Sequence, residues 1–561
     1  MDDPTKRESA ADSPGNAAGR RARADVLALL LCLLFFLQGL AFVRRVPIHN
    51  DEALFAAGIF QPITAEHTVR LFRRTIPTMV MSYIGAPKTL LYAGIFRVWP
   101  PSLCSLRLPV LAIGALTVWL FFLLLRDTIG RRAALAACAL LATDATFVLT
   151  TTLDWGPAAL QHLLVLSGLL LLWKFYRSER LLHLGAGFFA FGLGLWDKSL
   201  FVWMLVGLAA ATAVVFPREL LSKVTFRHLA VAGLAFAIGA SPLIQYNAAR
   251  RLKTLGANVR FSTAGVGEKA KVLRYSLQGD SMFGYVAANE PPPRPGRAGG
   301  ALEQAALALS NATGRRQSGF LMWAALAALA LLPWLWNSPA GKPMLFALVF
   351  MVVTWLQMAL NQDTGGGAHH VVLMWPFPHL FIAVAFTQAS LRLRRAGLAV
   401  LVAFVSVICA SNVLVTNQYL AQLTEWGTTA LWTDAVHPLS GYMERLGAKK
   451  VYVMDWGMFE SLRFLNRGRL PLLMERPPEA DPALRKVLST EGAVFLGHTT
   501  GNETAVSMSA EMQARAEAAG YRKEVLTVIA DRNARPMFEV YRYRPATAAP
   551  PTPATSRTPA K

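Results

Sequence analysis

Long apolar runs alternate with short polar connections from residue 25 to residue 416. Several of these runs reach the roughly 20 residues that a helix needs to cross a bilayer. We count 11 runs, at 25–43, 106–125, 133–151, 158–173, 183–196, 200–216, 229–246, 319–336, 343–360, 370–389 and 396–416. The pattern predicts a mainly α-helical, polytopic membrane protein with about 11 transmembrane helices.

The pattern changes after the last apolar run. From about residue 417, the stretches "KKVYVMDWG", "GAVFLGH", "KEVLTVIA" and "MFEVYRYR" are typical of strands, and "SAEMQARAEAAG" is typical of a helix. We therefore predict a membrane domain at 25–416 and a small α/β domain at 417–544. The low-complexity segments 1–24 and 545–561 are expected to be disordered.

The basic residues in the connections predict the orientation of the chain. They lie in alternate connections, namely Arg20, Arg21, Arg23, Arg126, Arg131, Arg132, Lys174, Arg177, Arg180, Arg218, Lys223, Arg227, Lys342, Arg392, Arg394 and Arg395. By the positive-inside rule, these connections and the N-terminus are cytoplasmic. An odd number of spans then places the two larger connections, 44–105 and 247–318, and the C-terminal domain outside the cytoplasm. We expect a multi-pass protein of the plasma (inner) membrane.

Composition excludes some classes of function. The chain is 54% hydrophobic and only 16% charged, with a formal net charge of +22. The basic residues fall in short connections between apolar runs, so we expect no nucleic-acid partner. The four cysteines form no CxxC pair, and three lie inside apolar runs, which argues against a disulfide framework or a zinc site.

Ionisable residues collect at the outer ends of several spans. They are Asp51 and Glu52 after the first span, Asp154 after the third, Asp197 and Lys198 after the fifth, and Asp363, His369 and His370 between the ninth and tenth. Such groups usually face a protein interior or an aqueous cavity. Structural roles stay open: Asp51 and Glu52 as solvated loop charges, Asp154 as the N-cap of the fourth span, and Lys198 as a partner of Asp197.

Lys88 belongs to an amphipathic stretch, "YIGAPKTLLYAGIFRVWP". A helix lying in the membrane interface would place its ammonium at headgroup depth, either as a phosphate contact or simply as a basic residue on an interfacial face. Transfer of a sugar from a lipid phosphate needs a base for the acceptor hydroxyl and cations for the leaving phosphate. No metal-ligand spacing such as HxxxH occurs, so the metal requirement is left open.

Five stretches, in order, resemble the membrane glycosyltransferases of the GT-C fold, in the branch of the protein O-mannosyltransferases and the aminoarabinose–lipid A transferases. The stretches are "HNDEALFAAG", "APKTLLYAGIFRVWP", "TTLDWGPAAL", "GLGLWDKSLFVW" and "GAHHVVLMWPFPHLF". The resemblance covers about residues 25–416. This chain departs from the family in having Pro-Lys-Thr in place of Lys-Pro-Pro, and Trp375 where tyrosine is common.

The resemblance implies a role for each candidate residue. Asp51 would be the general base, Glu52 would help to position a substrate, and Asp154 would be the second acidic group. The donor phosphate would be bound by Lys88 and Lys198, and the substrate would contact His369 and His370.

The function that follows is an inverting glycosyltransferase. It would move a sugar from a polyprenyl-phosphate donor to a lipid, glycan or protein acceptor on the extracytoplasmic side, with a divalent metal as an open possibility. A transporter or flippase of lipid-linked sugars is the first alternative, but it predicts mid-span charges and repeat symmetry, and the sequence has neither. A non-catalytic envelope assembly protein, acting through the outer α/β domain, is the second.

Overall fold

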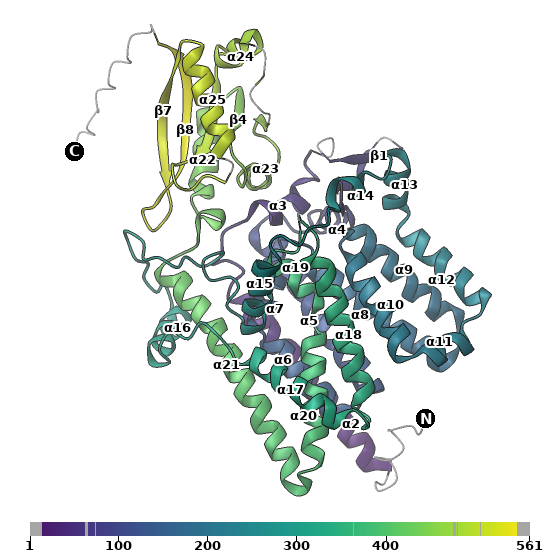
Figure 1. Cartoon of the computed structure of the whole chain (residues 1–561). Helices are drawn as coiled ribbons and strands as arrows, with labels where there is room; N and C mark the ends of the chain where they lie inside the picture. Colours follow the sequence, from purple (N-terminus) through teal and green to yellow (C-terminus); the bar gives the residue numbers. More distant parts are fainter. Residues whose placement is uncertain are drawn as a thin grey trace. The chain divides into compact units, whose positions relative to one another are not determined.

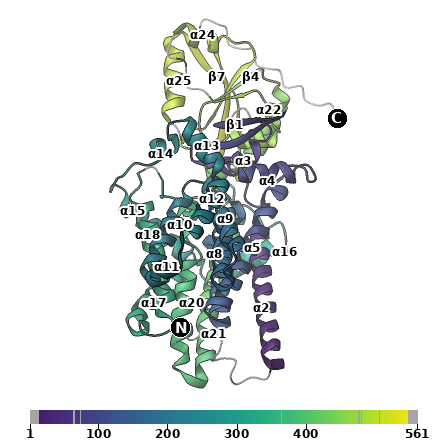
Figure 2. The same cartoon turned by 90° about the vertical axis from the view of Figure 1, so that its right-hand side faces the viewer.

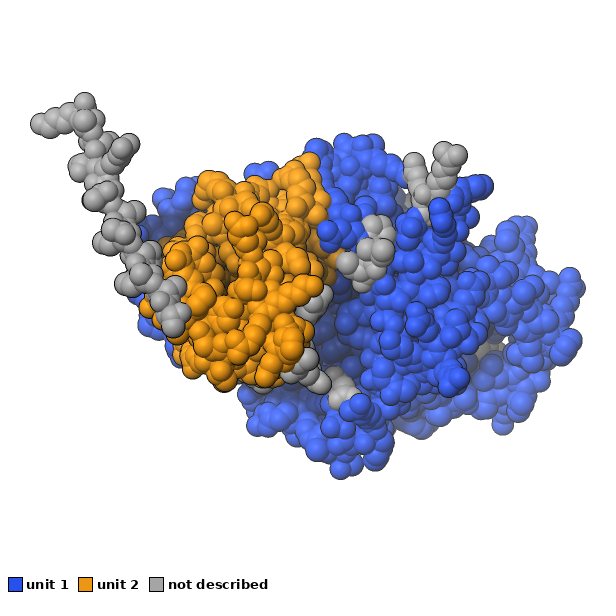
Figure 3. Space-filling model, turned by 90° about the horizontal axis from the view of Figure 1, so that it is seen from above, with its two compact units in different colours: residues 1–432 blue, residues 433–561 orange. Residues whose placement is uncertain are grey.

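The computed structural model describes residues 14–61, 65–72, 74–362, 364–474, 478, 481–504 and 506–546. The chain divides into two compact units, Met1–Trp432 and Thr433–Lys561, coloured blue and orange in Figure 3. Helix α2 (Pro14–Leu40) begins within the segment 1–24 that we expected to be disordered. Residues 1–13 and 547–561 lie outside the described residues, where the expectation of disorder stays a prediction.

The first unit is a bundle of apolar helices (Figure 1). Five stretches within the described residues are long and apolar enough to cross a membrane: Ala22–Leu40 in α2, α5 (Leu103–Thr128), α8 (Ala158–Ser178), α18 (Gly341–Ala359), and Arg394–Glu425, which contains α21 (Gly397–Glu425). Each stretch coincides with one predicted run. The prediction of a mainly helical multi-pass membrane protein is confirmed.

Four further predicted runs are bent pairs rather than straight helices. They are α6 (Arg131–Thr143) with α7 (Ala145–Leu153), α10 (Phe201–Val215) with α11 (Pro217–Lys223), α12 (Phe226–Gly239) with α13 (Ser241–Ala249), and Ala368–Met374 with α20 (Phe377–Leu391). The two remaining runs are the shorter apolar helices α9 (Leu181–Asp197) and α17 (Leu321–Leu335). All 11 predicted runs therefore correspond to apolar helices. Within the described part of the chain, however, at most nine spans are long enough to cross a membrane when each bent pair is counted as one.

Asp144 lies at the break between α6 and α7, where the chain bends by 61°. Its carboxylate caps α7 by accepting the backbone N–H of Phe147 at 2.8 Å. The same carboxylate contacts Trp375 Nε1 at 2.9 Å and His379 Nε2 at 3.0 Å. Because Trp375 and His379 flank the bend before α20, one buried carboxylate ties two broken spans together.

The connection after α2 forms a small folded layer at the end of the bundle opposite the N-terminus of α2 (Figures 1 and 2). It contains α3 (Asn50–Ala57), the antiparallel strands β1 (His67–Leu71), β2 (Arg74–Met81) and β3 (Ile84–Gly85), and α4 (Pro87–Ile95). Ile84 pairs with Lys198 at the turn between α9 and α10. A Cβ at Gly85 would lie 1.9 Å from the Trp196 carbonyl oxygen, so only glycine permits this approach. The contact fixes the start of α4 against the bundle.

The second large connection is also partly helical. It contains α14 (Lys253–Asn258), α15 (Val266–Gln278) and α16 (Ala301–Ala312). Near the end of α18, the short helices α19 (Ala368–Val371) and η2 (Val372–Met374) precede the bend into α20.

The second unit is a mixed α/β fold with strand order β5-β4-β6-β8-β7. Its helices are α22 (Val436–Leu446), α23 (Phe459–Leu465), α24 (Asp481–Leu488) and α25 (Val506–Ala518), and its strands are β4 (Lys450–Val453), β5 (Leu472–Leu473), β6 (Ala493–His498), β7 (Tyr521–Ala530) and β8 (Pro536–Pro545). Strand β4 runs parallel to β5 and β6, and β8 runs antiparallel to β6 and β7. The predicted mixture of helices and strands is confirmed, and the two-residue strand β5 is a strand that the sequence pattern did not predict.

Candidate active site

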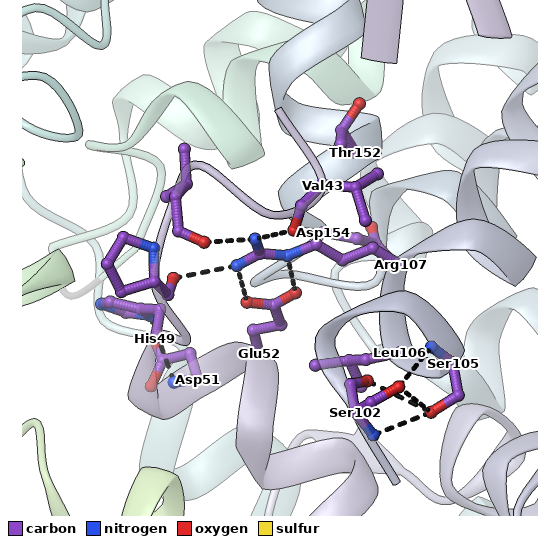
Figure 4. A network of polar contacts seen from close by, with 12 residues as sticks. Val43, His49, Asp51, Glu52, Ser102, Ser105, Leu106, Arg107, Thr152 and Asp154 are labelled. Carbon is purple, nitrogen blue, oxygen red and sulfur yellow. Dashed lines mark hydrogen bonds and ion pairs between the residues drawn. The ribbon is translucent and has the colours of Figure 1, made fainter. Parts of the chain in front are cut away.

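A buried ion pair anchors α3 to the bundle (Figure 4). Glu52 in α3 accepts hydrogen bonds from Arg107 Nε at 2.6 Å and Nη2 at 2.7 Å. The remaining N–H groups of Arg107 donate to the carbonyl oxygens of Val43, Val46 and Pro47 at 2.5–2.9 Å. All five guanidinium donors are thus occupied, and α3 is tied both to α5 and to the turn that follows α2.

This anchor presents Asp51, the neighbour of Glu52, on another face of α3. His49 is the N-cap of the helix, and its Nδ1 accepts the backbone N–H of Asp51 at 3.2 Å. Burial and the charge of Arg107 lower the pKa of His49 to about 3, so its ring is neutral and can accept this bond. Asp51 itself is half-buried.

The raised pKa of the Asp51 carboxyl group is suitable for a general base. Burial raises its pKa to about 6, against the lowering effects of the Asn50 hydrogen bond and the Lys198 charge. A carboxylate with a pKa near 6 is ionised at neutral pH, and it holds a proton more readily than an ordinary aspartate does. Its charge also acts on the phenol groups of Tyr83 and Tyr285, which places these two rings nearby.

Lys88 and Asp154 form a second buried ion pair. Lys88 Nζ lies 2.7 Å from Asp154 Oδ2 and donates to the Asp154 carbonyl oxygen, also at 2.7 Å. The ammonium also lies 4.2 Å from the centre of the Phe55 ring, and the lysine is only 1% exposed. Lys88 is therefore not a basic residue on an exposed interfacial face.

Asp154 occupies the turn between α7 and α8 in a left-handed conformation, with φ at +42°. Its Oδ1 accepts the backbone N–H of Ala159 at 3.0 Å, so the carboxylate contacts the first turn of α8 while it binds Lys88. Burial raises the pKa of Asp154 against the attraction of the Lys88 ammonium. The N-cap residue of α8 is Pro157, so Asp154 is not the N-cap of the fourth span; its carboxylate instead joins the first turn of α8 to Lys88.

Lys198 is the second buried lysine of the site, at 3% exposure. Its ammonium makes no hydrogen bond or ion pair with any residue that the structure describes. Burial lowers its pKa to about 8, against the attraction of Asp197, Asp51 and Asp154. Lys198 therefore carries its charge at neutral pH without a carboxylate in direct contact.

His369, the first residue of the histidine pair, and Lys198 lie on either side of Gly156. A Cβ at Gly156 would lie 3.3 Å from Lys198 Nζ and 2.5 Å from His369 Cδ2. The indole N–H of Trp155 donates to His369 Nδ1 at 2.8 Å, and the rings of His369 and His370 have centres 3.9 Å apart. The short helix α19 thus brings His369 to the Lys198 side of the α7–α8 turn.

Aromatic rings pack beside Asp51 and Trp155. The His49 ring stacks on Trp432 with centres 4.3 Å apart, and Trp155 meets Trp432 edge to face at 5.5 Å. Tyr285 contacts both tryptophans, at 5.8 Å from Trp155 and 6.4 Å from Trp432. These rings form an apolar cluster next to the N-cap of α3.

The structure brings together most of the predicted site residues. Asp51, Lys88, Asp154, Lys198 and His369 lie at one end of the bundle and are linked by the contacts above. Glu52 faces Arg107 instead, so its carboxylate is not presented to a substrate. Asp363 lies outside the described residues.

Sequence reasoning missed several partners in the site. Arg107, at the start of an apolar run, was a usable signal, because a charge in such a place needs a partner. The aromatic residues Trp155, Tyr285 and Trp432 gave no comparable signal, because aromatic residues make up 10% of this chain and occur along most of its length. Among the described residues, no group of three His, Cys, Asp or Glu side chains is placed to hold a metal ion.

Comparisons with known proteins agree with this architecture. Residues 89–246 match the family described as dolichyl-phosphate-mannose-protein mannosyltransferase. The solved structure of ArnT from Cupriavidus metallidurans bound to undecaprenyl phosphate superposes with a TM-score of 0.52 at 13% identity, covering 92% of this chain and 97% of ArnT. The apo state of the same protein gives 0.52 at 14% identity, covering 94% and 98%.

The oligosaccharyltransferase of Archaeoglobus fulgidus, in its apo form, superposes with a TM-score of 0.50 at 12% identity, covering 87% of this chain and 71% of that protein. A search of curated proteins finds no match. The family match and the shared fold confirm the predicted GT-C fold and the predicted class of enzyme, a glycosyltransferase.

Proposed function

We propose that this glycosyltransferase moves a sugar from a polyprenyl-phosphate donor to a lipid, glycan or protein acceptor at the extracytoplasmic face of the membrane, with inversion at the anomeric carbon. The observation that carries the proposal is the position of a half-buried carboxylate, Asp51, beside an ammonium that lacks a contact partner among the described residues, Lys198. A base and a cation are the two groups that this transfer requires.

Asp51 is the general base. Its carboxylate takes the proton of the acceptor hydroxyl, and the hydroxyl oxygen forms a bond to the anomeric carbon of the donor sugar. The bond between that carbon and the phosphate oxygen breaks, and the polyprenyl phosphate leaves with the electron pair. A pKa of about 6 lets Asp51 be ionised before the step and accept a proton during it.

Lys198 compensates the charge of the leaving phosphate. Its ammonium is buried, so its attraction for an anion is stronger than it would be in water. Lys88, which the resemblance also assigns to the phosphate, already contacts the Asp154 carboxylate. We therefore assign Lys88 and Asp154 to positioning the α7–α8 turn, and Lys198 to the phosphate.

Glu52 acts through Arg107. Their ion pair holds α3, and with it Asp51, in a fixed place on the bundle. His369 and His370 are assigned to substrate contact, because His369 lies across Gly156 from Lys198. The solved ArnT structure that holds undecaprenyl phosphate supports a polyprenyl carrier for this chain as well.

The proposed orientation rests on charge. The connections at the other end of the spans carry the arginines and lysines of the positive-inside pattern. The site residues follow the first, third and fifth spans, which end on the opposite side. A donor lipid in the outer leaflet would bring its phosphate to the level of these residues.

The test is glycolipid profiling by mass spectrometry of a deletion strain complemented with wild type, Asp51→Asn or Glu268→Gln at matched expression. Glu268 is an exposed carboxylate in the second outer connection and serves as the control. We expect a glycan species to vanish in the deletion, to return with wild type and Glu268→Gln, and to stay absent with Asp51→Asn. Full restoration by Asp51→Asn would refute the role of Asp51 as the base.

A further inference from the structure

Lys269, in α15, is a buried lysine that binds backbone carbonyl groups. It is 8% exposed, and its ammonium donates to the carbonyl oxygens of Met358 at 3.0 Å, Asn361, and Thr364 at 2.7 Å. An ammonium has three N–H donors, so these three acceptors match its full capacity. The arrangement joins one charged side chain to the last turn of α18 and to two points of the loop that follows it.

That loop is the connection between α18 and α19. Met358 lies in the last turn of α18, where helix carbonyls lack partners and carry partial negative charge, so a lysine there is favourable. Gly365 packs on the same carbonyl, because a Cβ at Gly365 would lie 2.4 Å from the Met358 oxygen, and its φ is +91°. The chain is therefore folded tightly around the ammonium.

The segment before α15 holds the same loop from its other side. Ser262 N–H donates to the Leu360 carbonyl at 3.0 Å, and Gln362 N–H donates to the Arg260 carbonyl at 2.8 Å. The Asn361 amide donates to the Asn258 carbonyl at 3.1 Å. These contacts and Lys269 together form a clamp, in which Asn258, Arg260, Ser262 and Lys269 hold Met358, Leu360, Asn361, Gln362 and Thr364.

The clamped loop leads directly to the histidine pair. Only Gly365, Gly366, Gly367 and Ala368 separate Thr364 from His369. A run of three glycines confers little stiffness of its own, because glycine has the largest backbone freedom. The place of His369 beside Trp155 and Lys198 therefore depends on where the loop is held.

We propose that Lys269 is a positioning residue, which fixes the α18–α19 loop so that His369 and His370 contact the phosphate-bearing substrate next to Lys198. This inference rests on the proposed function, since it assigns the loop to the same donor site. The ammonium of Lys269 binds backbone carbonyl groups of this loop, so we assign its effect on the substrate to the position of the loop. Removal of the ammonium would take one hydrogen-bond donor away from each of three carbonyl groups and give the glycine run more freedom to move.

The experiment compares Lys269→Met with Lys271→Met in the full-length protein. Lys271 lies on the same helix with its side chain 56% exposed, paired only with the exposed Glu268 among the described residues, so it is a matched control. The first measurement is the mobility of a nitroxide at Gly366→Cys, in a background with Cys104→Ser and Cys409→Ser. A Cβ at Gly366 meets no atom within 4 Å, so the label has room. The second is the Kd for undecaprenyl phosphate in nanodiscs.

We expect Lys269→Met to sharpen the nitroxide spectrum and to weaken undecaprenyl phosphate binding about tenfold, the order of effect that a misplaced substrate contact produces. Lys271→Met should change neither quantity. Loss of folded protein alone would reduce the number of binding sites at an unchanged Kd, which separates a positioning role from a structural one.

Three outcomes would overturn the inference: an unchanged nitroxide spectrum in Lys269→Met, a mobile loop with wild-type Kd, or fewer sites at an unchanged Kd. Failure of the proposed donor class is recognised separately, because the wild-type protein would then fail to bind undecaprenyl phosphate while the nitroxide measurement still reports on the clamp.

Discussion

The ion pair between Glu52 and Arg107 can be tested by substitution of either partner. The side chains are 2% and 0% exposed, and two contacts of 2.6 and 2.7 Å join them. Glu52→Gln keeps the shape of the side chain but removes its charge. It also turns one acceptor oxygen into an N–H₂ group that faces a guanidinium donor.

The expected cost follows from burial. Removal of one partner of a buried ion pair costs about 3–5 kcal/mol, because the other charge is left without compensation. Glu52→Gln retains one acceptor for Arg107 Nε, so we expect the lower end, about 3 kcal/mol of unfolding free energy. Arg107→Met should cost at least as much, since it also leaves the carbonyls of Val43, Val46 and Pro47 without their donor.

The assay is equilibrium unfolding in mixed micelles for wild type, Glu52→Gln, Glu52→Met, Arg107→Met and the Glu52→Met/Arg107→Met double variant. The double variant removes both charges, so it should lose less than the sum of the single losses, with a coupling free energy of about 2 kcal/mol or more. Additivity within about 0.5 kcal/mol would refute the reasoning. Glu52 would then not hold α3 on the bundle, and direct contact of its carboxylate with the substrate would become the favoured interpretation.

Two further predictions concern the reaction itself. Asp51 must be ionised and Lys198 protonated, so with pKa values of about 6 and about 8 the rate should rise with pH through 6 and fall above 8. At pH 5 it should be about a tenth of its maximum, and a flat profile of initial transfer rates from pH 5 to 9 would contradict both assignments. Gly156→Ala would drive a methyl group against His369 Cδ2 and Lys198 Nζ, so we expect kcat/KM to fall about tenfold or more. Gly233→Ala, at a helix position with open space around the added methyl group, should leave kcat/KM unchanged; equal values for both variants would show that the close approach at Gly156 has no role.

The apolar runs and the strands of the second unit were predictable because each depends on local sequence alone. A run of about 20 apolar residues needs no tertiary partner to be recognised, and alternation over a few residues suffices for a strand. The break at Asp144 was not predictable, because the apolar run 133–151 continues through it. The break depends on hydrogen bonds to Trp375 and His379, more than 200 residues along the chain.

The site was predictable in its residue types but not in its pairing. Lys88 and Asp154 are 66 residues apart in sequence, and no local pattern joins them. For the contact between Glu52 and Arg107, only the arginine could be recognised from the sequence, because an arginine inside an apolar run requires an anionic partner. The sequence did not identify that partner, because several carboxylates lie near the ends of the spans. Choosing among them required the path of the chain between α2 and α5.

Pairing decides which charges are available for chemistry. A charge that is neutralised by contact inside the fold contributes little to a charge that develops on a leaving group, because its field is already balanced at short range. Arg107 is balanced by Glu52, and Lys88 by Asp154. Lys198 has no such contact among the described residues, and Asp51 remains half-buried beside it. The two ion pairs thus hold the helix ends in place, and we assign the proposed transfer to Asp51 and Lys198, whose charges are not neutralised by an ion pair with another described residue.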